Sequence, residues 1–453
     1  MTIFGLAEAT VIELAGAVRS SPMSWPTAAT DAPTDAAAHV PEDGAAQAAA
    51  AHAVADATEA ADVFARAAWT GIAEPGDGAA GLLVQALGAA PALTAVLDLW
   101  TPARLAAVVA ESGAVDEARA EGADDLAALL DQGLQRWRPR LSSGEVIRSL
   151  HQAARASTRL LLPGDVLWPV GVDDLGLHAP LALWWRGIPG ALLALSNSIA
   201  LVGARAASGY GEHVAMEASA GLVDRGFAIV SGAAYGIDGM AHRAALASSG
   251  VTVAFLAGGA DRYYPSGHDE LLGRIATQGA VISELPCGSA PTKWRFLQRN
   301  RLIAASSAAT VVLEAGWRSG SLNTAGHASA LGRPLGAVPG PVTSPTSAGC
   351  HRLIREYDAV CVTNAAEMAE LVGERMLQLT LDLPADEGGT AGFGGRTSEQ
   401  IRVFDALSSR SPRTVNDIAR RAGLSAAAVQ GSLGALDLEG AVRERETGWV
   451  RAG

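Results

Sequence analysis

Short apolar runs recur through the middle of this chain, and stretches with a helical spacing of apolar residues separate them. Gly211–Asp224 and Ala241–Ser248 are two of the helical stretches. Strands that alternate with helices over so long a span predict an α/β fold, in which helices cover both faces of a doubly wound, mostly parallel sheet. The predicted strands are Leu181–Trp185, Ser198–Val202, Ala228–Val230, Val251–Leu256, Val281–Ile282, Thr310–Leu313 and Leu335–Val338.

The 453 residues are too many for one core, and changes in composition predict five segments. Residues 1–55 carry a short amphipathic pattern followed by Ala, Pro, Thr and Asp, so we expect a low-complexity tail. Residues 56–156 have helical spacing and predict a small helical domain. The sheet domain spans residues 160–375, and a flexible, glycine-bearing linker at 376–396 joins it to a separate unit at 397–453.

The last segment has the pattern of a winged helix: two helices, the turn Ala422–Ser425, a third helix, and a strand that ends near Trp449. The third helix, Ala426–Leu438, is the one that would read the major groove, yet it contains no lysine or arginine. We therefore favour contact with protein, or support of a dimer, as the role of this domain.

A basic stretch at 293–301 lies in a protein whose formal net charge is −13. Phosphates attract cations, and unstacked bases lie on flat rings, so this composition predicts a site for single-stranded nucleic acid. The alternative is that the arginines pair with nearby acids and the phenylalanine packs in the core. The side chains concerned are Arg295, Arg299, Arg301 and the only lysine of the chain, Lys293, with Trp294 and Phe296 between them.

Small residues follow four of the predicted strands. They let a polyanion approach the backbone, where N–H groups at the next helix start can bind phosphate. Arg205 and Arg318 lie beside two of these turns and would add charge. The turns are Gly203–Gly209, Ser231–Gly236, Ala257–Gly259 and Trp317–Leu322, and they make Gly203, Ser231, Gly232, Ser319, Gly320 and Ser321 candidate phosphate-binding residues.

Cofactor and catalytic sites lack their signals in this sequence. The chain has neither GxGxxG nor GxxxxGKS/T, so a nucleotide cofactor lacks its fingerprint. Asp238 and His242 share a helix face, but no third metal ligand matches their spacing. We expect Asp238 to bind backbone amides and to hold His242, and we interpret Glu314 as structural. No cofactor, no metal and no catalytic residue are therefore expected.

The cysteines and the hydropathy pattern bear on the compartment. Cys287, Cys350 and Cys361 are odd in number and lack a CxxC spacing, which favours a reducing cytoplasm over a disulfide-bonded or zinc-binding protein. No apolar run is long enough to span a bilayer, so we expect no membrane contact.

These patterns closely resemble the DNA-processing protein A family, also called DprA or Smf. The resemblance runs from about Pro163 to Leu371, and the flanking helical (SAM-like) and winged-helix units fit the layout of that family. It is carried, in order, by Ser231–Asp238 with Ala241 and His242, Gly258 and Gly259 with Tyr264 and Pro265, Ser283 and Glu284, Phe296 with Arg299–Arg301, Ser319–Leu322 with Thr324 and Ala325, and Ala337–Gly340.

The resemblance implies an extended Rossmann-like domain in a cytoplasmic, non-catalytic protein that forms homodimers. It implies that the protein binds single-stranded DNA and loads the RecA recombinase onto it, in recombination and in the DNA uptake of natural transformation by competent cells. Carried over by position, it assigns DNA contacts to Arg205, Lys293 and Phe296. It extends the same groove along Arg299, Asn300 and Arg301, with the asparagine as a hydrogen-bonding residue.

The sequence departs from the family pattern at a few positions. Ala204 stands where the family has Ser or Thr, which removes one hydroxyl from the phosphate turn. His351 and the pair Tyr357 and Asp358 also differ, in the part of the sheet domain that the family uses for dimer and recombinase contacts.

Two other functions are compatible with parts of the sequence. The fold class with Gly-rich turns also resembles nucleotide N-glycoside hydrolases of the lysine-decarboxylase-like group, but Ala257–Asp261 replaces their PGGxGT turn. Release of a free base from a nucleoside monophosphate would favour that reading. Alternatively, the helical and winged-helix domains form a protein-interaction scaffold and the basic stretch is incidental.

Overall fold

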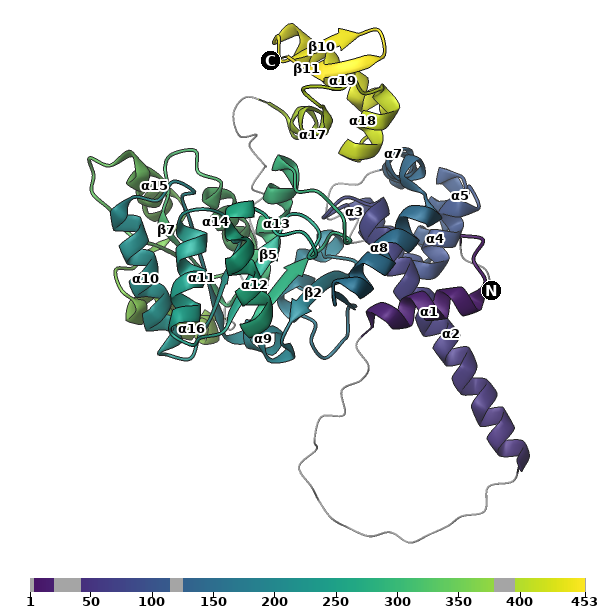
Figure 1. The fold of residues 1–453 in the computed structure, drawn as a ribbon, viewed down its shortest axis with the longest axis horizontal. Coiled ribbons are helices and arrows are strands. Elements are labelled where there is room, and N and C mark those ends of the chain that lie inside the picture. The colour runs from purple at the N-terminus through teal and green to yellow at the C-terminus, as the bar shows by residue number, and fades with distance from the viewer. Residues whose placement is uncertain (1–3, 20–41, 115–124, 379–395, 453) are drawn as a thin grey trace.

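Nine strands form one sheet at the centre of the chain, in the order β1-β2-β6-β5-β4-β3-β7-β8-β9 (Figure 1). The computed structural model describes residues 4–19, 42–114, 125–378 and 396–452. β2 is antiparallel to β1 and β6, and the other neighbours are parallel, so the predicted α/β class is confirmed. The strands are β1 (Arg159–Leu161), β2 (Leu183–Gly187), β3 (Ser198–Gly203), β4 (Ala228–Ser231), β5 (Thr252–Leu256), β6 (Ala280–Ser283), β7 (Ala309–Glu314), β8 (Leu335–Ala337) and β9 (Val360–Cys361).

The strand order reverses between β3 and β7, which lie side by side although they are far apart in sequence. From β3 the chain adds β4, β5 and β6 on one side, and from β7 it adds β8 and β9 on the other. The loops that follow β3 and β7 therefore leave the same edge in different directions. In open α/β sheets, ligands bind at such a point.

Helices cover both faces of the sheet because successive strand residues point to opposite sides. In β3, Ala200 and Val202 pack on one layer of helices, whereas Ile199 and Leu201 pack on the other. The first layer holds α9 (Pro189–Leu193), α13 (Lys293–Ser306), α14 (Ser321–Ala330) and α15 (Ala348–Glu356). The second holds α10 (Gly209–Val223), α11 (Ile237–Ala247), α12 (Asp269–Gln278) and α16 (Ala365–Gln378).

The helical domain packs around Phe64, Trp69 and Trp137, all fully buried. The indole N–H of Trp69 donates to the carbonyl of Ala89 at 3.1 Å, and the two tryptophan rings meet edge to face. The helices are α1 (Glu8–Val18), α2 (Glu42–Ile72), α3 (Gly78–Leu87), α4 (Ala89–Leu97), α5 (Pro102–Glu111), α7 (Leu126–Trp137) and α8 (Ser143–Arg155).

Helix α1 corrects the expectation of a tail at residues 1–55. Val11, Leu14 and Val18 are buried against the helical domain, and Arg19 at the end of α1 is ion-paired with Asp165 at 2.6 Å. The low average content of large apolar residues in the segment concealed a short stripe that packs once α2 and α8 are in place. Residues 42–55 of the predicted tail belong to α2. Residues 1–3 and 20–41 of that segment lie outside the described residues, as do residues 379–395 of the predicted linker.

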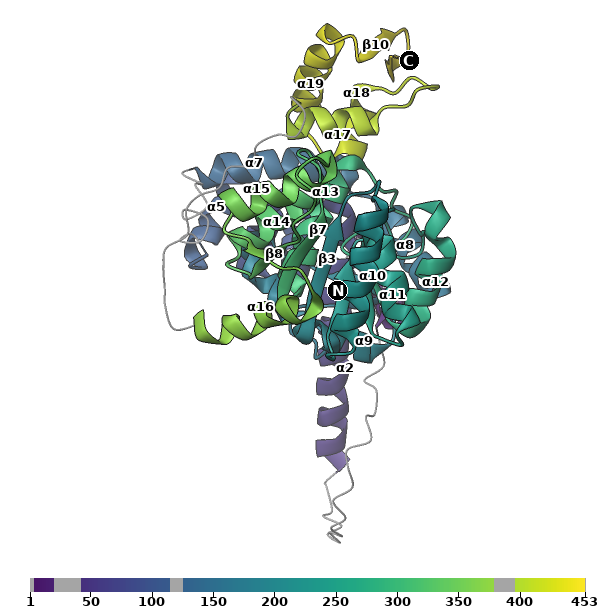
Figure 2. The ribbon, with the colours of Figure 1, turned by 90° about the vertical axis from the view of Figure 1, so that its left-hand side faces the viewer.

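The C-terminal domain has the predicted winged-helix pattern and sits over α13 and α7 in both ribbon views (Figures 1 and 2). Thr397, Thr414 and Ser425 cap its three helices, and Gly423 ends the second in a left-handed conformation. Its elements are α17 (Ser398–Ala406), α18 (Val415–Ala422), α19 (Ala426–Leu438), β10 (Val442–Arg445) and β11 (Gly448–Arg451).

Within the described ranges, no single helix is both long and apolar enough to cross a membrane. The bent pair α3 and α4, with 110° between its members, meets the same length and hydropathy test only when the two are taken together.

Candidate nucleic-acid interface

The carboxyl ends of the parallel strands and the first turns of α13 meet at one edge of the sheet. The loops after β3 and β5 bring Arg205 and Tyr264 there, and α13 contributes Lys293 and Phe296. Helix α13 begins where it does because the hydroxyl of Thr292 accepts the N–H of Arg295 at 3.2 Å. Lys293 is therefore the first helical residue, and Phe296 lies one turn further along.

Arg205, Tyr264, Lys293 and Phe296 are accessible at this edge, and we call them the basic-aromatic cluster. The guanidinium carbon of Arg205 lies 4.9 Å from the centroid of the Phe296 ring, within the range of a cation–π contact. The ring of Tyr264 lies 5.6 Å from the same centroid and is 49% exposed. Lys293 and Arg205 are exposed and Phe296 is half-buried, so the cluster offers flat rings and two cations to solvent.

Arg299 lies beneath the cluster and is only 6% exposed. Its Nη1 donates to the carbonyl of Phe255 at 2.7 Å, and the carboxylate of Asp238 balances its charge. Burial lowers the pKa of Arg299 to about 10, more than Asp238 raises it. Gly232 leaves the room for this guanidinium, because a Cβ at that position would collide with it. Arg299 thus supports the loops after β4 and β5 from below.

Asn300 lies beside the turn at 319–321. The amide Nδ2 of Asn300 donates to the carbonyl of Gly320 at 3.3 Å. The hydroxyls of Ser319 and Ser321 bond each other at 2.7 Å at the start of α14. The N-cap residue of that helix, Gly320, offers no side-chain cap. Within this turn, the N–H of Ser319 donates to the carbonyl of Gly316 at 3.1 Å, and the N–H of Ser321 donates to the hydroxyl of Ser319 at 3.4 Å.

Two arginines of the basic stretch turn away from the cluster and pair with acids. The guanidinium of Arg295 donates to both oxygens of Glu74, at 3.1 and 2.8 Å. Arg301 is 3% exposed, and its Nη2 donates to Glu284 at 2.7 Å. The alternative of pairing with nearby acids therefore describes these two residues, but not Lys293.

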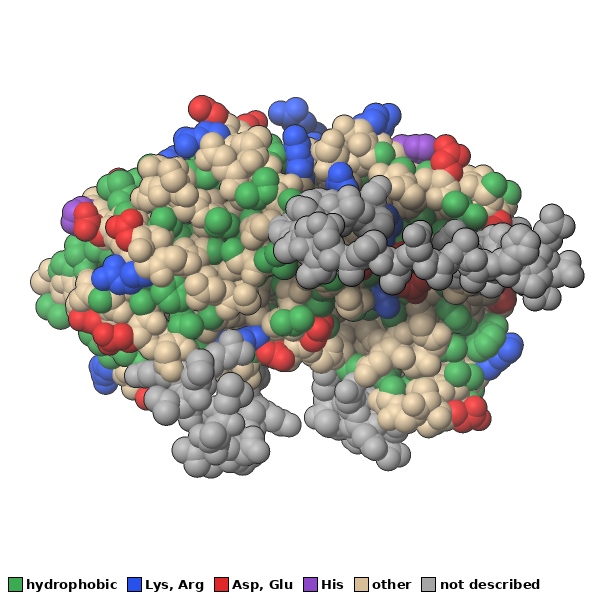
Figure 3. Space-filling view, turned by 90° about the horizontal axis from the view of Figure 1, so that it is seen from below, with side chains coloured by type: hydrophobic (Ala, Val, Ile, Leu, Met, Phe, Trp, Pro, Cys, Tyr) green, Lys and Arg blue, Asp and Glu red, His purple; other side chains and the backbone are tan. Residues whose placement is uncertain are grey.

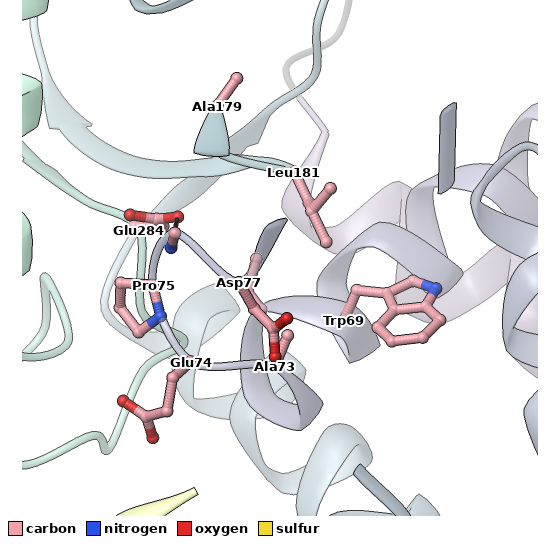
Figure 4. A pocket seen from close by; sticks show the side chains of 10 residues that line it. Trp69, Ala73, Glu74, Pro75, Asp77, Ala179, Leu181 and Glu284 are labelled. Carbon is pink, nitrogen blue, oxygen red and sulfur yellow. Dashed lines mark hydrogen bonds between the residues drawn. The ribbon is translucent and has the colours of Figure 1, made fainter. Parts of the chain in front are cut away.

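The two acids flank the turn that leaves α2, where Glu74 and Glu284 lie on either side of Pro75 (Figure 4). The pocket drawn there, about 20 Å³, has room for about one water molecule and no larger ligand. Arg140 of the helical domain also pairs with Glu74, at 2.9 Å. Glu74, Arg140 and Arg295 therefore meet where α13 faces the helical domain.

At the reversal of strand order, a carboxylate of the chain itself occupies the position of an anion. Glu314, the last residue of β7, accepts the N–H of Ser208 at 2.9 Å and its hydroxyl at 2.6 Å, at the start of α10. The hydroxyl of Thr346 donates to the same carboxylate at 2.6 Å. This supports the structural interpretation of Glu314. It also fills the place where a bound nucleotide would put a phosphate in this fold class.

Two further residues that were predicted to contact phosphate pack within the sheet domain. Ser231 is fully buried, and its hydroxyl donates to the carbonyl of Leu201 at 2.6 Å. A Cβ at Gly203 would approach the carbonyl of Glu314 to 2.9 Å, so the glycine permits close packing of β3 on β7. The structure therefore does not bring Gly203 or Ser231 to the cluster.

Asp238 accepts backbone N–H groups from Gly232 at 3.2 Å and Ala234 at 3.4 Å, as predicted. The expectation that it holds His242 is wrong. The ring Nδ1 of His242 instead bonds the hydroxyl of Thr252 at 2.7 Å, because the helix turns the histidine inward onto β5. Burial lowers the pKa of His242 to about 3. Among the described residues, no group of three or more His, Cys, Asp or Glu could hold a metal ion.

Tyr264 is the cluster residue that sequence reasoning did not assign to the site. It had one signal, an aromatic residue shortly after the Gly258 and Gly259 turn at a strand end. On the face opposite the winged-helix domain, acidic and basic side chains are interspersed among apolar and polar ones (Figure 3).

Comparisons with known proteins agree with this architecture. A family model described as DNA recombination-mediator protein A matches residues 159–373, and one described as the DprA winged helix domain matches residues 394–446. The chain is 46% identical over 312 residues to a DNA processing protein DprA of Mycobacterium tuberculosis, covering 66% of this chain and 79% of that protein. It is 36% identical over 289 residues to the protein Smf of Escherichia coli, covering 61% of this chain and 76% of the relative.

Among solved structures, the DNA processing protein A of Streptococcus pneumoniae is similar to this chain, with 26% sequence identity and a TM-score of 0.51. The similarity covers 68% of this chain and 97% of the pneumococcal one.

Proposed function

The chain belongs to the DprA family of DNA recombination-mediator proteins, and on that basis we propose that it binds single-stranded DNA through the basic-aromatic cluster. One observation carries the proposal: the half-buried ring of Phe296 lies between the guanidinium of Arg205 and the exposed ring of Tyr264, with Lys293 one turn away. Single strands need rings for their bases and cations for their phosphates. On a molecule with a net charge of −13, such a site must be local.

The proposed site consists of accessible residues that contact the DNA and buried residues that support them. Lys293 and Arg205 neutralise phosphates, and Phe296 stacks a base with Tyr264 extending the platform. A phosphate contact at the turn 319–321 stays a prediction, since the N–H groups of Ser319 and Ser321 already have acceptors in the protein. Arg299 and Asn300 act from below, since one supports the loops after β4 and β5 and the other positions that turn. Direct contacts from Arg301, expected from the family resemblance, and from Gly203 and Ser231, expected from the strand-end turns, stay predictions.

We propose a binding role without catalysis. The buried acids nearest the cluster are committed to other partners: Glu314 to Ser208 and Thr346, and Asp238 to two backbone amides. A general acid or base needs a carboxylate that can reach a substrate proton. Among the described residues at this edge, neither acid is placed for that task.

Loading of the RecA recombinase and formation of a homodimer are further parts of the proposal and rest on family membership. Strand β9 ends the sheet, and Tyr357 and Val360 are exposed beside it. An edge strand with apolar neighbours suits pairing with a second copy. Light scattering should give the mass of two chains, and Tyr357→Arg should lower it to that of one. The rate of RecA assembly on a labelled single strand should rise when this protein is added.

The primary test is fluorescence anisotropy with labelled single-stranded and duplex oligonucleotides over a range of salt concentrations. We expect preference for the single strand, and weaker binding for Lys293→Ala and Arg205→Ala. Removing one cation that neutralises a phosphate should lower the slope of log K against log salt by about 0.7. Arg148→Ala removes the same charge from the exposed side of α8 and should leave the slope unchanged. Equal affinity of the wild type and the Lys293→Ala, Arg205→Ala double variant would reject the site.

A further inference from the structure

The start of α13, which carries Lys293, is also where the winged-helix domain contacts the sheet domain. Helix α17 lies over α13 in both ribbon views (Figures 1 and 2). Near the end of α17, Oδ2 of Asp405 accepts the N–H of Trp294 at 3.2 Å. One turn earlier, the guanidinium carbon of Arg402 lies 5.3 Å from the centroid of the Trp294 ring. The proposed DNA-binding helix thus begins beneath another domain of the same chain.

The carboxylate of Asp405 has the surroundings that a phosphate needs. The first N–H groups of a helix have no partner within the helix and favour an anion. Thr292 accepts the N–H of Arg295, and Asp405 accepts the N–H of Trp294. The positive charge of Lys293 also acts on Asp405. The oxygen of Asp405 therefore occupies the place that an oxygen of a DNA phosphate would take at this helix.

The contact between the domains is incompletely packed. A cleft of about 910 Å³ remains at the junction of the three domains, lined by residues that include Asp77, Trp294 and Arg402. The buried indole N–H of Trp294 has no hydrogen-bond partner among the described residues. Burial raises the pKa of Asp405, although the N–H groups of Trp294 and Lys293 lower it, so the charge is only partly compensated. Polar and loosely packed interdomain contacts of this kind can open.

We propose that the first turn of α13 is a phosphate site for the DNA backbone that the winged-helix domain fills with Asp405, so that single-stranded DNA and the docked domain compete for it. This inference rests on the proposed function of the cluster. The DNA then binds only to molecules whose winged-helix domain has left α13. The apparent dissociation constant for DNA is therefore the intrinsic constant divided by the fraction of molecules whose winged-helix domain is undocked.

Two substitutions with opposite charge changes test the competition in the full-length protein. Asp405→Asn removes a negative charge, and Arg402→Gln removes a positive charge, but both weaken the contact with Trp294. If docking competes with DNA, both variants should bind a single-stranded oligothymidylate about three- to tenfold more tightly in the anisotropy assay. A purely electrostatic effect would instead strengthen binding in the first variant and weaken it in the second.

The controls separate this inference from the proposed function. Asp437→Asn removes the same charge from the exposed side of α19 and should leave the affinity unchanged. Arg402 also bonds the carbonyls of Ala422 and Gly423, so circular dichroism and thermal unfolding should first show that Arg402→Gln remains folded. Weaker binding by Arg402→Gln, or no change in either variant while Lys293→Ala still weakens binding, would reject the competition but keep the DNA site. Wild-type affinity of the Lys293→Ala, Arg205→Ala double variant would reject both.

Discussion

At the scale of single residues, Phe296 decides whether the cluster stacks bases. Its ring is half-buried between Arg205 and Tyr264, so one part packs and the other remains accessible. Phe296→Ala and Phe296→Leu should each weaken single-strand binding by about 1 to 3 kcal/mol, because both lack a flat ring. Anisotropy titrations with an oligothymidylate measure this difference.

Two variants at this position separate stacking from packing. Phe296→Tyr keeps the ring and should bind nearly as well as the wild type. Phe296→Leu keeps most of the apolar contact within the protein. Wild-type affinity in the leucine variant would show that Phe296 contributes to the core and not to stacking.

Residue types in the basic stretch predicted a charged, aromatic site, but they did not distinguish its members. Lys293 and Arg299 both lie on α13 and differ completely in exposure. An α-helix has about 3.6 residues per turn, so neighbouring cations necessarily face different surroundings. Which side of α13 faces solvent depends on how the sheet and the helical domain pack on it. That packing is set by residues outside the stretch.

At the scale of elements, Glu314 ties the end of β7 to the start of α10. Glu314→Gln replaces one carboxylate oxygen, which accepts hydrogen bonds, with an NH₂ group, which donates them. That NH₂ group would face the donors of Ser208 and Thr346. We expect the free energy of unfolding to fall by about 1 to 3 kcal/mol, since buried donors are left without an acceptor. Urea denaturation measures this change, and single-strand affinity should fall with it because the turn that carries Arg205 is anchored there.

Thr346→Val provides a milder comparison, because it removes only one of the three hydrogen bonds to Glu314. Its unfolding midpoint should lie between those of the wild type and Glu314→Gln. A Glu314→Gln protein with wild-type stability would mean that the carboxylate does not hold the two elements together.

Elements in the centre of the sheet were predictable from the sequence, and those at its edges were not. Each predicted strand has a counterpart among β2 to β8, because buried parallel strands are continuous apolar runs. Strands β1 and β9 have only 3 and 2 residues and were missed. Such short segments carry no periodicity, and their pairing with a neighbour defines them.

At the scale of the whole molecule, Glu74 links three domains. Glu74 belongs to the turn after α2 and forms ion pairs with Arg140 and with Arg295 of α13. The positive charge of Arg402, in the winged-helix domain, also lowers the pKa of Glu74. Burial is the largest single influence and raises the pKa of Glu74, but Arg295 and Arg140 together lower it to about 2 from 4.5. A carboxylate whose pKa is lowered on folding stabilises the protein above pH 4.5, and this stabilisation disappears as the pH falls towards 2.

Glu74→Gln should therefore lower the stability at pH 7 by about 3 to 5 kcal/mol, because buried arginines are left without their partner. The difference from the wild type should shrink as the pH falls below about 4.5, which thermal unfolding between pH 3 and 7 would show. Glu59→Gln is the matched control, since its pair with Arg19 is 3.5 Å long and largely exposed. A pH-independent difference for Glu74→Gln would contradict the assignment of this charge.

The sequence by itself determined the fold class and the winged-helix pattern, since these depend on apolar periodicity, caps and turns among residues close in the chain. The tertiary structure decided what depends on neighbours in space. It buried α1 on the helical domain, paired Arg295 with Glu74 across 221 residues, and left Lys293 and Phe296 accessible on the same helix. Burial and ion pairing are set by surroundings assembled from distant segments, so residues of one type and one stretch acquire different roles only when the domains meet.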